Sequence, residues 1–331
     1  MSPDAHILTR LRRSGGAGVA VSDLTGVVAG DPIGLPGRIA ALRQLGYDIT
    51  STVHGGFVLR SGPDRLHADD LVSRLPDRRR IGRTIQVFQE TSSTNDVVER
   101  LARDGVEEGA VVFAESQTQG RGRMGRRWES PSGRGLWFSV LLRPRIPLAA
   151  ATQLTVMAAV AAARAIGHAS GLEPEIKWPN DLHLRGRKCG GILLELGAES
   201  DQIHHVILGM GIDVNLSANE IPPQIRGIAT SLSQESGRTM DRPALAAQLL
   251  EELDSAYEGI LTGRFSTLAD EWERRCTTLG RRVAIRVGPR EIHGLAEALD
   301  EQGALLLRTE HGRLERIIGG EVSLLSAAPS S

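Results

Sequence analysis

The sequence predicts an α+β protein built from three successive units, because the pattern of helices and strands changes twice along its 331 residues. Residues 1–80 contain three short helical patterns followed by a hairpin pattern. Residues 81–276 mix strands and helices without a regular strand–helix–strand repeat, which predicts a mixed sheet. Residues 277–326 contain five short alternating segments separated by glycine-containing turns, a pattern typical of a small β-barrel.

The composition limits the class of protein. A net charge of −1 with 24% charged residues excludes a chain that coats nucleic acid along its whole length. Cys189 and Cys276 form neither a disulfide framework nor a zinc-ligand pattern, so we expect a reducing compartment. The most apolar stretch, 148–163, is too short and too rich in alanine for a membrane span and predicts a buried helix. With no signal-peptide pattern at Met1, we expect a soluble, cytoplasmic protein without a membrane partner.

The first unit has the element order of a winged helix-turn-helix, a fold that places one helix in the DNA major groove. Asp4 is expected to cap the first helix. Eleven arginines and eight aspartates give residues 1–80 a charge of +3, while the remainder carries −4. The other elements expected in this unit are helices at 22–28 and 35–45 and strands at 47–53 and 57–60.

In the other two units, hydrophobic periodicity predicts most of the elements. In the second unit they are helices at 95–103, 149–167 and 242–261, strands at 110–115, 136–142 and 205–214, and a hairpin at 182–196. In the third unit they are strands at 282–287, 291–299, 304–308, 313–318 and 322–325.

Lysine is rare in this chain, and its two occurrences lie close together. Of 39 basic residues only Lys177 and Lys188 are lysine, and Asn180, one of four asparagines, lies between them. A compact ammonium is not replaced by the planar guanidinium of arginine. The two lysines are therefore candidates for a role that needs lysine itself.

A segment rich in glycine and arginine is the first chemical motif. Gly120, Gly122 and Gly125 match the G-x-G-x-x-G dinucleotide fingerprint, but the segment that follows, 128–135, cannot begin a helix, and no acidic residue stands about twenty residues on. A loop whose arginines and backbone N–H groups wrap an anionic intermediate fits better, and a solvated basic surface loop is the alternative.

The second motif runs from Lys177 to Glu195. A turn at Arg185–Gly186 is expected to fold it into a hairpin and to bring Asp181 close to Lys188. A surface salt bridge would explain that pair. A set of cations with a metal-holding carboxylate would also offset the roughly 4 kcal/mol of repulsion when one anion attacks another. The chain has no P-loop motif, and this candidate set comprises Arg121, Arg123, Lys177, Lys188 and Asp181.

Two further segments admit both a structural and a functional interpretation. The polar run 90–96 is a helix cap, and its hydroxyls and amide also suit a neutral polar ligand such as a cyclic urea. The glycines of 209–215 either allow a close approach to a strand or mark a β-bulge. Cys189 is more consistent with a core residue than with a nucleophile.

Together these segments resemble the bacterial biotin–protein ligase family, particularly its bifunctional ligase and biotin-operon repressor members. The resemblance covers nearly the whole chain. It implies a class-II-synthetase-like central domain, an SH3-like C-terminal barrel, and the substrates biotin and ATP with Mg²⁺. The matching segments are Ser93–Asn95, Gln117, Gly120–Arg126, Lys177–Asp181, Arg187–Leu193, Gly209–Asn215 and Ile318–Glu321.

The resemblance also implies roles for individual residues. Lys188, Arg123, Asp181 and Lys177 would be catalytic, with Lys188 at the biotin carboxylate and the α-phosphate and with Asp181 as the metal ligand. Biotin would be bound by Ser93, Thr94, Asn95, Gln117, Arg121, Gly122, Arg123 and Lys188. The nucleotide would be bound by Arg121, Arg123, Arg126, Lys177, Asn180 and Asn215.

The partners implied are a biotin carboxyl carrier domain, operator DNA and a second copy of the chain when biotinyl-adenylate is bound. The third helix departs from the repressor pattern, because it opens with Gly34–Gly37 and leaves Arg38, Arg43 and Gln44 as its polar donors. Two alternatives stay open. One is a lipoate–protein ligase-like enzyme, and the other is a biotin-sensing transcription factor without catalysis.

Overall fold

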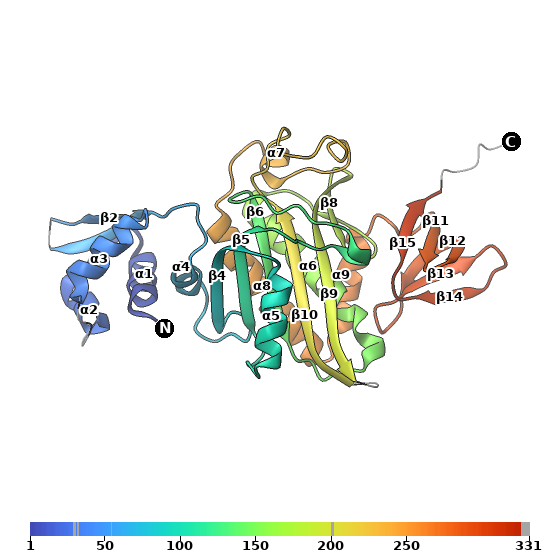
Figure 1. Cartoon of the computed structure of the whole chain (residues 1–331), viewed down its shortest axis with the longest axis horizontal. Helices are drawn as coiled ribbons and strands as arrows, with labels where there is room; N and C mark the ends of the chain where they lie inside the picture. The colour runs from blue at the N-terminus through green and yellow to red at the C-terminus, as the bar shows by residue number, and fades with distance from the viewer. Residues whose placement is uncertain (29–30, 32, 54, 200–201, 326–331) are drawn as a thin grey trace.

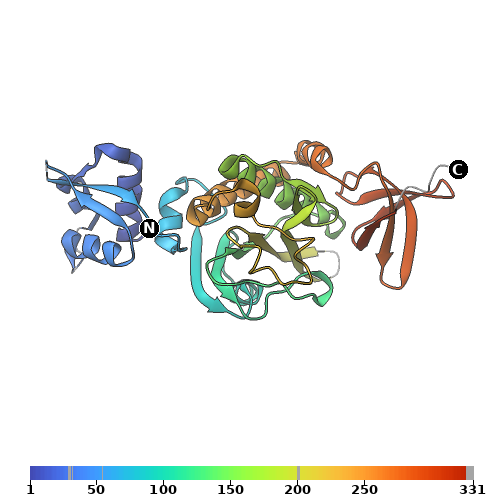
Figure 2. The ribbon, with the colours of Figure 1, turned by 90° about the horizontal axis from the view of Figure 1, so that it is seen from above.

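The computed structural model describes residues 1–331 except 29–30, 32, 54, 200–201 and 326–331. Three β-sheets lie in a row along the long axis of the molecule, with the N-terminal elements at one end and the last strands at the other (Figures 1 and 2). The end expected for the third unit, residue 326, lies outside the described residues.

The N-terminal elements form a small helical layer against a three-stranded antiparallel sheet of order β1-β3-β2. The expected cap at Asp4 is wrong by two residues: the hydroxyl of Ser2 accepts the N–H of Ala5 at 3.1 Å, and Asp4 lies in the first turn, where it pairs with Arg38. The elements are α1 (Pro3–Ser14), β1 (Val19–Ala20), α2 (Val21–Thr25), α3 (Gly34–Gln44), β2 (Asp48–Ser51) and β3 (Gly56–Ser61).

A short helix that the periodicity did not predict, α4 (Ala68–Arg74), connects these elements to the rest of the chain. It packs between α1 and α8 (Arg242–Leu261). Leu71 is fully buried in the hydrophobic core of the central sheet. Seven residues are too few for a clear helical period, which explains why the sequence did not reveal α4.

The central sheet has seven strands in the order β4-β5-β6-β10-β9-β8-β7. Its first two strands are parallel and all its other neighbours are antiparallel, so the sheet is mixed, as expected. The strands are β4 (Thr84–Thr91), β5 (Ala110–Gln117), β6 (Gly135–Leu142), β7 (Glu175–Lys177), β8 (Asp181–Leu184), β9 (Arg187–Glu199) and β10 (Gln202–Asp213).

Helices cover the two faces of this sheet unequally. One face packs against α6 (Thr152–Ser170) and, behind it, α8 and α9 (Phe265–Arg275), whereas the other carries α5 (Thr94–Arg103) (Figure 1). The stretch 148–170 is long and apolar enough to cross a membrane, but 72% of its most apolar window is buried inside the structure. Its hydropathy is therefore that of a core helix, which confirms the prediction. A short helix, α7 (Leu232–Ser236), follows the long loop after β10.

The last five strands form an antiparallel sheet of order β14-β13-β12-β11-β15. All five were expected from the sequence. Val283 and Ile285 are fully buried and join the central hydrophobic core, so this sheet is packed onto the rest of the molecule. The strands are β11 (Arg282–Val287), β12 (Arg290–Leu299), β13 (Leu305–Thr309), β14 (Leu314–Ile317) and β15 (Glu321–Leu324).

Candidate active site

The hairpin β8–β9 brings the predicted pair of opposite charges together. Arg185 and Gly186 both have positive φ, 50° and 75°, as a tight two-residue hairpin turn requires. The Nζ of Lys188 donates to Oδ1 of Asp181 at 2.7 Å, which confirms their predicted proximity. Lys177 lies opposite Asp181 in the β7–β8 pairing, so the two residues are cross-strand neighbours.

Arg123 reaches this hairpin from the glycine- and arginine-rich loop. One Nη donates to Oδ1 of Asn180 at 3.1 Å and to the carbonyl of Gly320 at 3.3 Å. Burial lowers the pKa of Arg123, and the carboxylate of Asp181 opposes that effect. The C-terminal sheet therefore helps to hold an arginine beside the Lys188–Asp181 pair.

The loop itself is fixed by its own backbone rather than by a following helix. Gly122 donates its N–H to the carbonyl of Arg126 at 2.7 Å, and Trp128 donates to the carbonyl of Gly120 at 2.9 Å. Only a single 3₁₀ turn, Arg123–Gly125, precedes the extended chain that leads to β6, so the loop is not a dinucleotide-binding turn. Two of its arginines contact acids, Arg121 pairing with Asp96 and Glu195 and Arg126 pairing with Glu321.

A buried polar cluster lies at the start of α5. The hydroxyl of Thr94 lies 2.7 Å from that of Ser139, which in turn donates to Oδ1 of Asn95 at 2.5 Å. Gln117 accepts the N–H of Thr94 at 2.9 Å. Asn95 donates to Glu195 at 2.8 Å. Three of the residues predicted from the sequence therefore meet here. Ser139 is an addition that the sequence did not reveal, and Glu195 closes the Lys177–Glu195 motif but was given no role.

The glycines of β10 allow two side chains to lie directly on the strand. A Cβ on Gly209 would lie 2.4 Å from Oδ1 of Asn95, and one on Gly211 would lie 2.6 Å from the indole of Trp128. The β9–β10 register shifts only near residues 203–205, so Gly209 and Gly211 serve close approach and not a bulge. The Nζ of Lys188 lies 5.2 Å from the Trp128 ring centroid, a cation–π arrangement.

Two groups in this region are unusual, one for a missing hydrogen-bond partner and one for a shifted pKa. The buried Nε1–H of Trp128 has no hydrogen-bond acceptor among the described residues. A buried donor of this kind is costly unless a ligand or water accepts from it. Asp213, at the end of β10, lies within reach of the field of Lys188, yet burial raises its pKa to about 8. Both lie in segments singled out from the sequence, 128–135 and 209–215, but neither was given a role there.

Some predicted residues are engaged elsewhere. Both ends of the Asn215 amide bond the backbone of Met240, at 2.9 and 3.0 Å. Ser93 is buried at the start of α5. Cys189 is fully buried, and burial raises its pKa, so its thiol is held inert, as expected. Its Sγ lies 3.5 Å from the carbonyl of Leu182.

The helix expected to contact DNA is α3. There the guanidinium of Arg38 pairs with Asp31 and Asp4, and Arg43 donates to the carbonyl of Ile49 at 2.8 Å. Gln44 is exposed. Two of the three polar donors therefore make intramolecular contacts in this structure.

The site contains one carboxylate suited to a cation held mainly by phosphates. Among the described residues no three His, Cys, Asp or Glu side chains are grouped as metal ligands. Mg²⁺ commonly takes one or two protein carboxylates and fills its remaining positions with phosphate oxygens and water. Asp181 matches that requirement, although its carboxylate pairs with Lys188 here.

These observations define what the region can do chemically. Lys177, Lys188 and Arg123 concentrate positive charge around one carboxylate, as an anion–anion reaction requires. The neutral donors and acceptors beside α5 suit an uncharged polar ring. The two zones share the β9–β10 floor, so a single ligand could span both.

Comparison with known proteins assigns the chain to a family. Residues 87–213 match the biotin/lipoate A/B protein ligase family, and residues 278–325 match the biotin protein ligase C-terminal domain. The chain is 36% identical to the bifunctional ligase/repressor BirA of Bacillus subtilis and 32% identical to that of Escherichia coli, and each alignment covers 88% of the relative. They cover 87% and 88% of this chain, respectively.

A solved structure agrees with this assignment. The biotin protein ligase of Aquifex aeolicus, described in complex with biotin and ATP, is 31% identical with a TM-score of 0.64. The match covers 74% of this chain and the whole length of the Aquifex aeolicus chain. The two family matches, the sequence identity over most of the chain and the similar solved structure all indicate the same family. This protein belongs to the biotin–protein ligase family.

Proposed function

We propose that this chain activates biotin with ATP and then transfers the biotinyl group to a lysine of a carrier protein. In the first step a carboxylate oxygen of biotin attacks the α-phosphorus of ATP, and pyrophosphate leaves. In the second step the amine of the acceptor lysine attacks the acyl carbon, AMP leaves with the bonding pair, and the amine loses a proton. The observation that carries the proposal is the grouping of Lys177, Lys188 and Arg123 around Asp181.

In the first step the cations lower the repulsion between two anions. Lys188 would contact the biotin carboxylate and the α-phosphate, a role supported by the position of its ammonium beside Trp128 and Asp181. Arg123 would cap the adenylate from the loop above, with Arg121, Gly122 and Arg126 along the same loop. Lys177 and Asn180 complete the nucleotide side, and the amide of Asn215 would have to exchange its Met240 partner to contribute.

The ureido ring of biotin would occupy the polar cluster at α5. Thr94, Asn95 and Gln117 offer donors and acceptors there, with Ser93 at the same helix start. Ser139 and Glu195 orient Asn95 by bonding both ends of its amide. The same cluster gives no counterpart for a purely apolar dithiolane ring, which favours biotin over lipoate.

Mg²⁺ would be held by Asp181 together with the phosphates of ATP. The ion would neutralise phosphate charge as pyrophosphate departs. Lys188 and a bound Mg²⁺ would compete for the Asp181 carboxylate. Lys188 would therefore be released from Asp181 toward the reacting oxygens.

We further propose the acceptor, the oligomer and the compartment. The acceptor is a biotin carboxyl carrier domain, a proposal supported by similarity to the biotin–[acetyl-CoA-carboxylase] ligase of Mycobacterium tuberculosis, 33% identical over 72% of this chain. Pairing of two copies in the adenylate-bound state is a further prediction. A cytoplasmic location agrees with two unbonded cysteines, Cys189 and Cys276.

The N-terminal unit, residues 1–80, is proposed to be a winged helix-turn-helix that makes the chain a biotin-responsive repressor. Support comes from its own sheet and buried cluster and from the bifunctional relatives. Exposed Gln44 and the remaining N–H groups of Arg43 are its candidate DNA contacts, and Arg38 would have to leave its acids to join them. Residues 81–276 are proposed as the catalytic domain and 277–326 as an SH3-like domain.

The test of the activity is ATP–pyrophosphate exchange with the purified chain, comparing biotin with lipoate. Biotin-dependent exchange is expected, and exchange with lipoate alone would assign the chain to the other branch of its family. Biotin binding without any exchange would identify a sensor. A salt-sensitive complex with its own upstream DNA, formed in the presence of biotin and ATP, tests the repressor function.

A further inference from the structure

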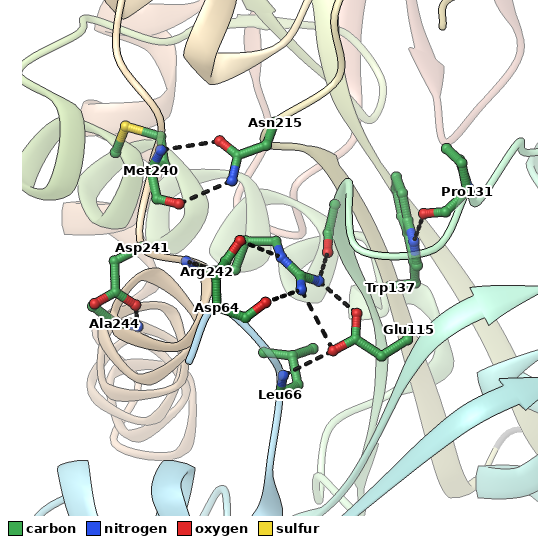
Figure 3. A network of polar contacts seen from close by, with 11 residues as sticks. Asp64, Leu66, Glu115, Pro131, Trp137, Asn215, Met240, Asp241, Arg242 and Ala244 are labelled. Carbon is green, nitrogen blue, oxygen red and sulfur yellow. Dashed lines mark hydrogen bonds and ion pairs between the residues drawn. The ribbon is translucent and has the colours of Figure 1, made fainter. Parts of the chain in front are cut away.

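A buried arginine behind the site, Arg242, bonds three separate segments. It is the first residue of α8, and its side chain is 2% exposed. Its guanidinium donates to Glu115 of β5 at 2.7 Å, to the carbonyl of Gly135 of β6 at 3.3 Å, and to the carbonyl of Asp64 at 2.7 Å. Figure 3 shows these contacts converging on one side chain.

The segment between β3 and α4 closes this network. The carboxylate of Asp64 accepts the backbone N–H and the Nε–H of Arg242, at 3.1 and 3.3 Å. Leu66 donates its N–H to Glu115 at 2.8 Å (Figure 3). The segment 64–66 therefore supplies both an acceptor and a donor to the interior of the central domain.

The other ends of the network reach the candidate ligand site. Glu115 lies two residues before Gln117, which accepts the N–H of Thr94 at 2.9 Å. Gly135 pairs with Asp213 across β6 and β10, beside Lys188. Arg242 and Glu115 touch no predicted ligand-binding atom themselves, so they act through these strands.

We infer that Arg242 and Asp64 are positioning residues for the biotin and ATP site, acting through β5 and β6. The inference rests on the proposed function for the identity of the ligand.

The test uses the full-length chain with Asp64→Ala, because this side chain is 44% exposed and its loss does not empty the core. Asp241→Ala is the matched control. Its carboxylate caps the same helix by accepting the N–H of Ala244 at 2.9 Å but bonds no member of the network (Figure 3). Asp64→Asn, which keeps an acceptor for Arg242, is the conservative variant.

Two measurements are made on each variant, namely biotin affinity by calorimetry and hydrogen exchange of the Leu66 and Thr94 amides in the ligand-free protein. Asp64→Ala is expected to weaken biotin binding about fivefold and to accelerate exchange at both amides. Asp64→Asn should recover most of the affinity. Asp241→Ala is expected to lower the melting temperature without changing either reading.

Wild-type affinity and exchange in Asp64→Ala, or equal changes in Asp64→Ala and Asp241→Ala, would overturn the inference. Failure of the proposed function is a different outcome. In that case the wild-type chain binds no biotin, while the exchange of the Thr94 amide still shows whether Asp64 supports the site.

Discussion

Two ion pairs in this molecule have the same length and different surroundings. Arg242–Glu115 and Lys188–Asp181 are both 2.7 Å long. The side chains of the first pair are 2% and 5% exposed, whereas those of the second are 33% and 26% exposed. The first pair bonds three segments of the fold, and the second lies in the candidate site.

The difference teaches that burial, and not distance, separates a supporting pair from a reacting one. A buried charge left without its partner is strongly destabilising, so the first pair must stay intact at all times. A half-exposed pair contributes little to stability, because water and salt screen it. The contact between Lys188 and Asp181 can therefore open at a small cost in free energy, which would free Lys188 for the substrate and Asp181 for the metal.

The largest effect is expected from Arg242→Ala, which leaves Glu115 buried without a counter-charge. The free energy of unfolding should fall by about 3–5 kcal/mol. Urea denaturation followed by circular dichroism measures it. The control is Arg308→Ala, which removes the exposed pair with Glu297 and should leave the free energy of unfolding nearly unchanged, because water and salt screen that pair. Equal losses in the two variants would remove the distinction drawn here.

Lys188→Ala should show the opposite pattern, with activity lost and stability kept. Adenylation is expected to fall about 10²–10³-fold, the usual effect of deleting one electrostatic stabiliser of a transition state. Lys188→Arg should not restore it, because a guanidinium does not reproduce a compact ammonium. Biotin-dependent pyrophosphate exchange reads the loss, and a melting temperature close to wild type confirms the fold. Near-normal exchange in Lys188→Ala would refute its catalytic role.

Gly211→Ala tests the part of β10 against which Trp128 packs. The added Cβ would lie 2.6 Å from the Trp128 indole, so the ring must shift and carry its unpartnered N–H with it. Overpacking of this kind costs about 1–3 kcal/mol, and we expect a higher KM for ATP. Gly227→Ala is the control, since no atom lies within 4 Å of its added Cβ. Unchanged kinetics in Gly211→Ala would show that Trp128 does not contact the ligand.

Asp213→Asn should give an effect that depends on pH. The folded chain holds a proton on Asp213 up to about pH 8, whereas the unfolded chain loses it near pH 4. The native state therefore binds more protons, and the contribution of this group to stability falls as pH rises through that window. The variant should melt above wild type at pH 8, by a margin that shrinks as pH falls and vanishes near pH 4. Exposed Asp77→Asn should show no such trend.

The sequence predicted most of the fold because its elements carry strong periods. The five C-terminal strands and the long helix α8 were located within one or two residues, since alternation and a continuous apolar face are local signals. The short elements α4 and α7 were missed, because five to seven residues do not define a period, and the longer elements β4 and α9 were not predicted either. The Asp4 cap failed since Pro3 and Ser2 offered an earlier start.

The sequence predicted only those parts of the site whose residues lie close together along the chain. The Lys188–Asp181 pair followed from a hairpin with a two-residue turn, which fixes register locally. Ser139, Glu195 and the Arg242 network could not be found in the same way, because their partners lie 44 to 178 residues away in sequence. Only the folded sheet brings them together.

The contact between Arg123 and the carbonyl of Gly320 spans 197 residues. During synthesis, the central sheet and its loop leave the ribosome long before Gly320 does. The loop arginine would therefore gain its last anchor only when the C-terminal sheet docks. A nascent chain with a folded central sheet would release its reactive adenylate more readily than the completed protein, so docking of the last strands would act as a late maturation step for the enzyme.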